Sequence, residues 1–347
     1  MKGGHVVSKT ELRLPVSGQR KGDAARGQPG ELGRRLEAFA LPLAGLVLIV
    51  IFGIMMPTTF LAMGNLSSIL SSQSVLVVVT LGLMIVLIAG DFDLSVGAVV
   101  CMSGMIVAVL TVQHDVPVGI AILAAVAAGL LVGFLNGFFV VALKINSLIV
   151  TLGMASVITG LVLWISNAHI ISGIPSSLID PVIVWRFLNI PMGFYYAMFI
   201  AVVVWYVFRY TPVGRRILVV GKSQEVARLS GIRVGAVRWS ALMASSVLAS
   251  LGGLLYAGTA GAAGPSSGLE LLLPAFAAAF LGTTTINPGR FNTWGSVIAV
   301  YFLVTGITGF QLLGAESFVQ DLFYGGSLIV AVSFSQIVRR QRNRGGV

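Results

Sequence analysis

A long segment without basic residues constrains the fold of this chain more than any other feature. No Lys or Arg occurs between Arg35 and Lys144, although the chain contains 22 of these residues. Soluble domains carry about 25% charged residues. Here only 10% are charged and 56% are hydrophobic, and the mean hydropathy is +0.97. Because such a chain must place most of its surface in lipid, we expect a polytopic helical membrane protein.

Apolar segments long enough to cross a bilayer recur along the whole chain. A membrane-spanning helix needs about 20 apolar residues, whereas the strands of outer-membrane barrels are about half as long and alternate in polarity. The pattern therefore favours helices over a barrel. We expect ten spans, at residues 38–56, 66–89, 95–112, 118–141, 147–166, 192–208, 239–258, 271–287, 293–312 and 318–337.

The distribution of basic residues predicts which loops face the cytoplasm. Lys and Arg gather in the first 37 residues, between Arg209 and Arg238, and from Arg339 onward. An even number of spans puts both termini on one side, and 21 of the 22 basic residues then lie there, with Arg186 as the exception. Basic residues mark the cytoplasmic side of membrane proteins. Their position in short loops and tails also argues against nucleic-acid binding, despite the net charge of +10.

These observations give a simple division of the chain. We expect a disordered, basic cytoplasmic tail at residues 1–37, a transmembrane domain at 38–337 with a cytoplasmic loop at 209–238, and a second basic cytoplasmic tail at 338–347. The fold class is all-α. The single cysteine, Cys101, excludes an internal disulfide, and the three histidines are too scattered for a metal cluster. We expect no metal site and no cofactor bound by this chain.

Two acids interrupt the apolar region, in the segment IAGDFDLSVGAVV at residues 88–100. A charged group in hydrocarbon costs several kcal/mol, so Asp91 and Asp93 need a reason to be there. Asp93 or Ser95 could cap the helix that follows. The segment could also be a helix break that lines a polar cavity, where irregular backbone is tolerated. The two explanations are compatible.

A second polar interruption, LGTTTINPGRFNTWGSV, occurs at residues 281–297. Helix breaks at corresponding places in two halves of a chain often mark a transport pathway. We therefore expect broken helices near residues 90–95 and 283–292, and a weak internal repeat that relates them.

The cytoplasmic loop contains the segment TPVGRRILVVGKSQEVARLSGIRV, residues 211–234. A short helix is predicted from Ser223 to Leu229, with Ser223 as the N-cap and Gly231 as the stop. Val226 and Leu229 share one face, which either docks a partner or lies on the membrane surface. The tripeptide at 221–223 resembles the end of a phosphate-binding loop, but Arg216 replaces its leading glycine. Hydrolase motifs are absent, so an enzyme is not expected.

Four segments, taken in chain order, resemble the membrane permeases of ribose-type bacterial ABC importers. They are AGDFDLSVGAVVCMSG (89–104), LNGFFVVALKINSLIVTLGMASVITGL (135–161), TPVGRRILVVGKSQEVARLSGIRV (211–234) and LGTTTINPGRFNTWGSVIAV (281–300). The resemblance covers about residues 65–336. It implies a multi-pass subunit of the bacterial inner membrane that forms the translocation path for a ribose-like monosaccharide.

The same resemblance implies partners. A periplasmic binding protein would deliver the sugar, and a separate ABC ATPase would hold ATP and Mg²⁺. A second permease copy, identical or different, would complete the membrane unit, surrounded by lipid. The resemblance places ATPase coupling at Gln224, Glu225, Ala227, Leu229, Ser230, Gly231 and Ile232. Candidates for the translocation path and its helix breaks are Asp91, Phe92, Asp93, Ser95, Asn136, Thr151, Thr284 and Asn287.

This chain departs from the family motif at two positions of the first break. The family has Gly where this chain has Asp91, and Ile where it has Phe92. We expect the Asp91 carboxylate to alter the polar surface of the passage. Two alternatives stay open: a proton-coupled secondary transporter that uses Asp91 or Asp93, and an ABC permease for branched-chain amino acids or nucleosides.

Overall fold

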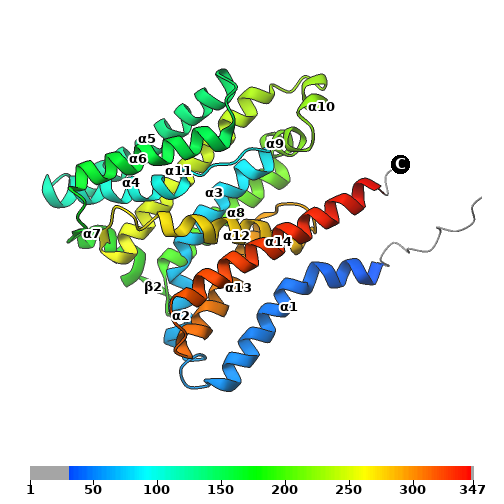
Figure 1. Ribbon diagram of the computed structural model, residues 1–347. Coiled ribbons are helices and arrows are strands. Elements are labelled where there is room, and N and C mark those ends of the chain that lie inside the picture. Colours follow the sequence, from blue (N-terminus) through cyan, green and yellow to red (C-terminus); the bar gives the residue numbers. More distant parts are fainter. Residues whose placement is uncertain (1–30, 345–347) are drawn as a thin grey trace, which may run out of the picture. The chain divides into compact units, whose positions relative to one another are not determined.

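The computed structural model describes residues 31–344 and consists mostly of helices (Figure 1). Its α-helices are α1 (Glu31–Met55), α2 (Met63–Ser72), α3 (Ser74–Ala89), α4 (Val96–Ala108), α5 (Val118–Gly137), α6 (Ser147–Ser166), α7 (Ser176–Ile179), α8 (Met192–Tyr210), α9 (Pro212–Lys222), α10 (Gln224–Leu229), α11 (Val234–Ala260), α12 (Leu272–Leu281), α13 (Thr293–Leu312) and α14 (Phe318–Arg344). Short π- or 3-10-helical segments extend or precede some of them: η1 (Val109–Gln113), η2 (Phe138–Ala142), η3 (Asp180–Val184), η4 (Leu269–Leu271) and η5 (Gly282–Thr284).

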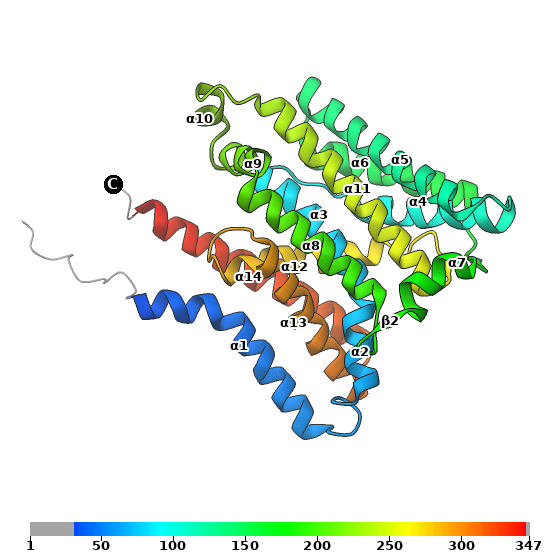
Figure 2. The ribbon, with the colours of Figure 1, turned by 180° about the vertical axis from the view of Figure 1, so that it is seen from behind.

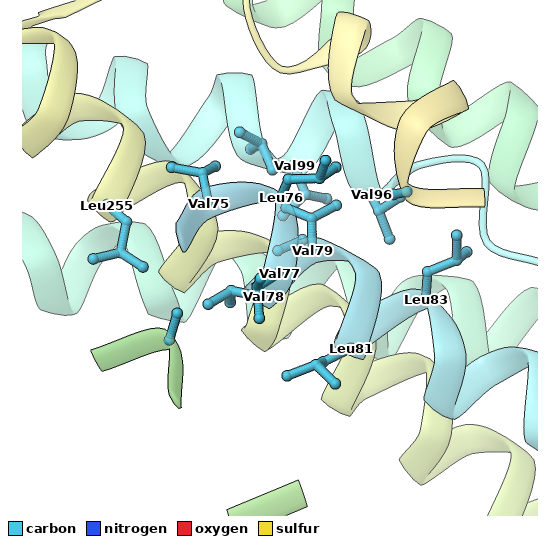
Figure 3. Close-up of a cluster of buried hydrophobic side chains, with 14 of the residues drawn as sticks. Val75, Leu76, Val77, Val78, Val79, Leu81, Leu83, Val96, Val99 and Leu255 are labelled. Atoms are coloured by element: carbon cyan, nitrogen blue, oxygen red, sulfur yellow. The ribbon is translucent and has the colours of Figure 1, made fainter. Parts of the chain in front are cut away.

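Helix α3 is the centre of the packing. Every residue from Ser74 to Leu87 is buried, and α3 contacts α8, α11, α12 and α13. Figure 3 shows side chains leaving α3 on several sides, with Val96 and Val99 of α4 and Leu255 of α11 around them. A helix that is apolar all round belongs in the interior. In Figure 2, which views the molecule from behind, α8 and α11 run beside α3.

The predicted spans match the helices in place. Among residues 31–344, seven helical segments are long and apolar enough to cross a membrane, and three shorter apolar helices lie at Phe39–Met55, Leu269–Thr284 and Phe318–Ser333. This confirms an all-α polytopic membrane protein. The number of crossings and the side of the termini stay predictions. The interruptions predicted near 90–95 and 283–292 are present, between α3 and α4 and between α12 and α13.

The helix ends differ from some predicted boundaries. Residues 1–30 and 345–347 of the two predicted tails lie outside the described residues. Helix α1 already begins at Glu31, inside the segment expected to be a disordered tail, and α14 continues to Arg344. Helix α11 begins at Val234, so the loop predicted at 209–238 includes its first turn. Polar residues extend α1 and α14 beyond their apolar parts, and α11 begins before Arg238. The hydropathy pattern alone does not mark these helix ends.

The long segment 167–191 is ordered against the end of α11. It contains strand β1 (Ile171–Ser172), which pairs antiparallel with β4 (Ala262–Ala263) just after that helix. A second pair joins β2 (Arg186–Phe187) to β3 (Ile190–Pro191). Val182 is buried, and a Cβ on Gly258 of α11 would lie 2.7 Å from its side chain. This packing fixes one end of α11, while its other end follows α9 and α10.

Candidate translocation and coupling site

Glycine at position 90 allows the first helix break. Gly90 has φ +89° and follows the last residue of α3. Its N–H donates to the carbonyl of Leu87 at 3.2 Å, and the N–H of Asp91 donates to the carbonyl of Val86 at 3.1 Å. This pair of bonds is the Schellman arrangement, which ends a helix with a left-handed residue. A side chain at position 90 would strain that conformation.

Two hydroxyls of α6 hold the backbone that follows. The N–H of Phe92 donates to Ser147 Oγ at 3.2 Å, and the N–H of Leu94 donates to Thr151 Oγ1 at 3.0 Å. Thr151 Oγ1 in turn donates to the Ser147 carbonyl at 2.8 Å. Outside a helix these N–H groups have no partner in their own segment, and a buried donor needs one. The fold therefore brings the first two sequence motifs together, as hydrogen-bond partners.

A buried polar chain runs from the break to α5. Asp93 Oδ1 accepts from the backbone N–H of Ser95 at 3.0 Å and from Ser95 Oγ at 2.5 Å. Ser95 Oγ accepts from Asn136 Nδ2 at 3.0 Å. All three side chains are fully buried. The break is thus tied to both α5 and α6.

This geometry corrects the prediction that Ser95 could cap α4. Ser95 makes no side-chain capping bond, because its own backbone is already helical, at φ −80° and ψ −11°. Its hydroxyl serves Asp93 and Asn136 instead. Asp93 accepts the N–H of Ser95, the residue that precedes α4, so this bond closes the turn before the helix and does not cap an N–H of the helix itself.

Asp91 forms a bidentate ion pair with Arg238. Arg238 Nε donates to Asp91 Oδ2 at 2.7 Å, and Nη2 donates to Oδ1 at 2.6 Å. The Asp91 side chain is 4% exposed and that of Arg238 is 21% exposed. Both oxygens of the carboxylate therefore face a protein group. That Asp91 alters the polar surface of the passage stays a prediction.

Phe92, between the two acids, points toward a different neighbour. Its ring lies against Phe276 of α12, with ring centroids 6.5 Å apart and planes inclined by 23°. Consecutive residues of the break are thus bound to different elements: Asp91 to α11, Phe92 to α12 and α6, and Asp93 to the start of α4.

The second break has its own hydrogen bonds. Asn292 caps α13, accepting from the N–H of Gly295 at 2.7 Å, and its Nδ2 donates to the Gly282 carbonyl at 3.0 Å. The hydroxyl of Thr284 donates to the Leu281 carbonyl at 2.7 Å, and Asn287 is exposed in the turn. The hydrogen bonds of Thr284 and Asn287 are local. In the first break, hydrogen bonds connect Asp93 with Ser95 and Asn136, and Thr151 with Phe92.

The predicted short cytoplasmic helix is present as α10. Ser223 Oγ accepts from the N–H of Val226 at 3.3 Å, which confirms the N-cap. Gly231 has φ +76°, and its N–H donates to the Arg228 carbonyl at 3.0 Å, which confirms the stop. The apolar face is open, with Val226 56% and Leu229 79% exposed.

The seven predicted coupling residues divide by exposure. Ala227 is fully buried, so it anchors α10 on its own chain, and Ile232 is half-buried. The other five are exposed: Gln224, Glu225, Leu229, Ser230 and Gly231. Residues 31–344 contain no group of three or more His, Cys, Asp or Glu side chains that could hold a metal ion.

Sequence reasoning missed Arg238 and Ser147. Arg238 is 147 positions from Asp91, and no local pattern connects them. A signal was nevertheless available. The predicted topology puts the end of α3 and the start of α11 on the cytoplasmic side, where an isolated acid and a basic residue would meet.

Residues 65–332 match the family model described as branched-chain amino acid transport system / permease component. The chain belongs to this family. It is therefore a permease subunit and not an enzyme. Its relatives and its apolar helices make it a multi-pass protein of the bacterial inner membrane.

Curated relatives match over most of their length. The D-allose transport system permease protein of Escherichia coli is 28% identical over 85% of this chain and 90% of its own. The L-arabinose ABC transporter permease protein of Azospirillum brasilense is 30% identical over 86% and 88%. The ribose import permease protein of Bacillus subtilis is 30% identical over 84% and 90%. No solved structure matches. The resemblance to ribose-type importer permeases is confirmed, and a proton-coupled carrier is not favoured.

Proposed function

We propose that this chain forms the translocation path for a monosaccharide in a bacterial ABC importer. The cargo class rests on the relatives, which are named for D-allose, L-arabinose and ribose. The observation that carries the mechanism is the exposed α10. This capped helix presents Val226 and Leu229 to solvent on the predicted cytoplasmic side, and an apolar helix face of this kind fits a groove on a partner.

The partners follow from this assignment. An ATPase subunit docks on α10 through its exposed residues, and it holds the ATP and Mg²⁺ that this chain does not bind. A periplasmic binding protein brings the sugar to the opposite side. A second permease copy, of the same or another sequence, completes the membrane unit within the lipid. The docking set comprises Gln224, Glu225, Leu229, Ser230, Gly231 and Ile232, with Ala227 beneath them.

The two helix breaks mark the proposed path. Irregular backbone at membrane depth is tolerated where protein or a water-filled cavity surrounds it. The first break supplies Phe92, Asp93 and Ser95, with Asn136 and Thr151 supporting it. Thr284 and Asn287 belong to the second break and are proposed as contributors from the other half of the chain.

The second candidate cargo is a branched-chain amino acid, because the matching family model is described by branched-chain amino acid transport. The subunit architecture is shared by both proposals, and the ligand of the associated binding protein separates them. A monosaccharide supports the first proposal. A branched-chain amino acid replaces it with the second.

Native co-purification tests the assignment. The chain is tagged at its C-terminus and extracted in mild detergent from its source bacterium, and the associated proteins are identified. We expect an ATPase subunit with the native chain and its loss from Glu225→Lys and Gly231→Trp. Arg233→Gln is the matched control, because Arg233 is exposed in the same loop outside α10, and it should retain the ATPase. Purification without any ATPase would refute the proposal.

A further inference from the structure

The Asp91–Arg238 pair connects the first helix break to the start of α11, which follows the proposed coupling residues 224–232. Asp91 is the first residue after the glycine that ends α3, and Arg238 lies in the first turns of α11, immediately after the segment that contains α10. The pair has the fork-to-fork geometry that fixes orientation as well as distance. The carboxylate also lies near the start of α11, where the helix dipole favours a negative charge.

A second contact joins the same two regions. A Cβ on Gly221, in the last turn of α9, would lie 1.7 Å from the Ile88 carbonyl oxygen. The ideal Cβ of Gly90 would lie 3.9 Å from the Gly221 Cα. The backbones of α9 and α3 therefore touch just before the break. Helix α10 follows Gly221 after two residues and precedes Arg238 by eight, so both of its flanks are attached to the same break.

The first helix break is in turn connected to α6 and α12. Phe92 follows Asp91 directly, its N–H is held by Ser147, and its ring lies on Phe276 of α12. A displacement of Arg238 moves Asp91 through two short charged hydrogen bonds. Because Asp91 and Phe92 share a peptide bond, the displacement reaches the groups that the proposed path contains.

Stability alone is a weak explanation for this pair. The cost of burying two charges offsets much of their attraction, and well-packed apolar residues are often as stable. What a buried, bidentate pair supplies is a single fixed geometry. A fixed geometry suits a contact through which one element must move another, because the two elements then keep the same relative position.

We infer that Asp91 and Arg238 are positioning residues that transmit the movement of α10 to the first helix break. Asp91 acts through Arg238 and not on the transported solute. This inference rests on the proposed function, since it requires an ATPase docked on α10. It adds a mechanical link at a position where the resembling family motif has glycine.

Hydrogen exchange on the purified complex tests the inference without knowledge of the cargo. The complex with its co-purified ATPase is placed in nanodiscs, and exchange of peptides 88–96 and 224–232 is compared with and without ATP and vanadate. In the native complex we expect both peptides to change severalfold. In Asp91→Asn and in Arg238→Gln, peptide 224–232 should still respond, while the response of 88–96 falls to less than a third.

Controls separate the two possible failures. Arg233→Gln removes an exposed arginine from the same loop and should behave as the native chain. The double variant Asp91→Asn/Arg238→Gln leaves no unpaired charge, so it remains informative if a single variant fails to fold, and its loss should equal that of either single variant. A full response of 88–96 in the folded variants overturns the inference. No response of 224–232 in the native complex overturns the proposed function instead.

Discussion

The backbone of the first helix break is satisfied by side chains of α6, a helix more than 50 residues along the chain. Thr151 is fully buried and its hydroxyl accepts the N–H of Leu94. An N–H group left without an acceptor in such a place costs about 1–3 kcal/mol. The hydroxyls of α6 therefore do for this segment what helical carbonyls do for an unbroken helix.

Replacing Thr151 by valine tests this role. Thr151→Val keeps the shape of the side chain and removes the acceptor of Leu94 N–H, so unfolding free energy should fall by about 1–3 kcal/mol. Thermal or denaturant unfolding in detergent measures it. Thr159→Val is the control, because the hydroxyl of Thr159 donates to the Ala155 carbonyl of its own helix. Equal effects of the two substitutions would contradict this role.

Gly221 is a residue whose absence of a side chain matters. Gly221→Ala should separate α9 from α3, because the added Cβ would lie 1.7 Å from the Ile88 oxygen, and overpacking of this kind costs about 1–3 kcal/mol. The melting temperature should fall. Gly160→Ala, in α6, has open space around the new Cβ and should leave stability unchanged or slightly higher. A Gly221→Ala protein as stable as the native chain would refute the contact.

At this scale the sequence predicts residue types better than partners. It indicates that Asp91 and Asp93 need a reason to lie in an apolar region, and it offers Asp93 or Ser95 as a cap for the helix that follows. It did not reveal that Arg238 satisfies Asp91 or that Ser147 binds Phe92. Such pairs depend on how helices pack, which no local pattern contains.

Among the elements, α10 has well-defined ends and an apolar face that is exposed to solvent. Ser223 and Gly231 define its ends, and buried Ala227 anchors it. Leu229 remains 79% exposed. Its limits were predictable because capping residues act locally.

A charge placed on that surface should separate folding from assembly. We expect Leu229→Glu to keep native thermal stability, since the side chain is already in solvent, and to reduce ATPase co-purification at least tenfold. Leu313→Glu is the matched control: Leu313 is 47% exposed, at the end of α13, and its substitution should leave the ATPase bound. ATPase retention in Leu229→Glu at native levels would show that α10 is not the docking element.

For the whole molecule, hydropathy and charge predicted the class and the places of the helices. Three apolar helices are shorter than the other seven: Phe39–Met55, Leu269–Thr284 and Phe318–Ser333. The predicted count of ten crossings requires that each of these three also crosses the bilayer. Boundaries shifted where a helix continues past a charged residue, as α1 does between Glu31 and Glu37 and α11 does at Arg238.

Cysteine accessibility tests the predicted topology. In a Cys101→Ala background, one cysteine is introduced at Leu188 or at Arg215, both exposed. An impermeant maleimide should label position 188 in intact spheroplasts and position 215 only after permeabilisation, because basic loops lie inside. The reverse pattern would invert the orientation, and labelling of both positions in intact spheroplasts would refute the ten-span arrangement.

The central claim is that an ATPase docked on α10 drives solute through this chain. The most direct measurement is uptake of the solute bound by the associated binding protein, in proteoliposomes that contain the permease and its ATPase. ATP supplied on the ATPase side should be required, an uncoupler should have no effect, and Asp91→Asn should reduce uptake per ATP hydrolysed. Uptake driven by a proton gradient without ATP would contradict the importer and point to the acids of the first break as proton carriers.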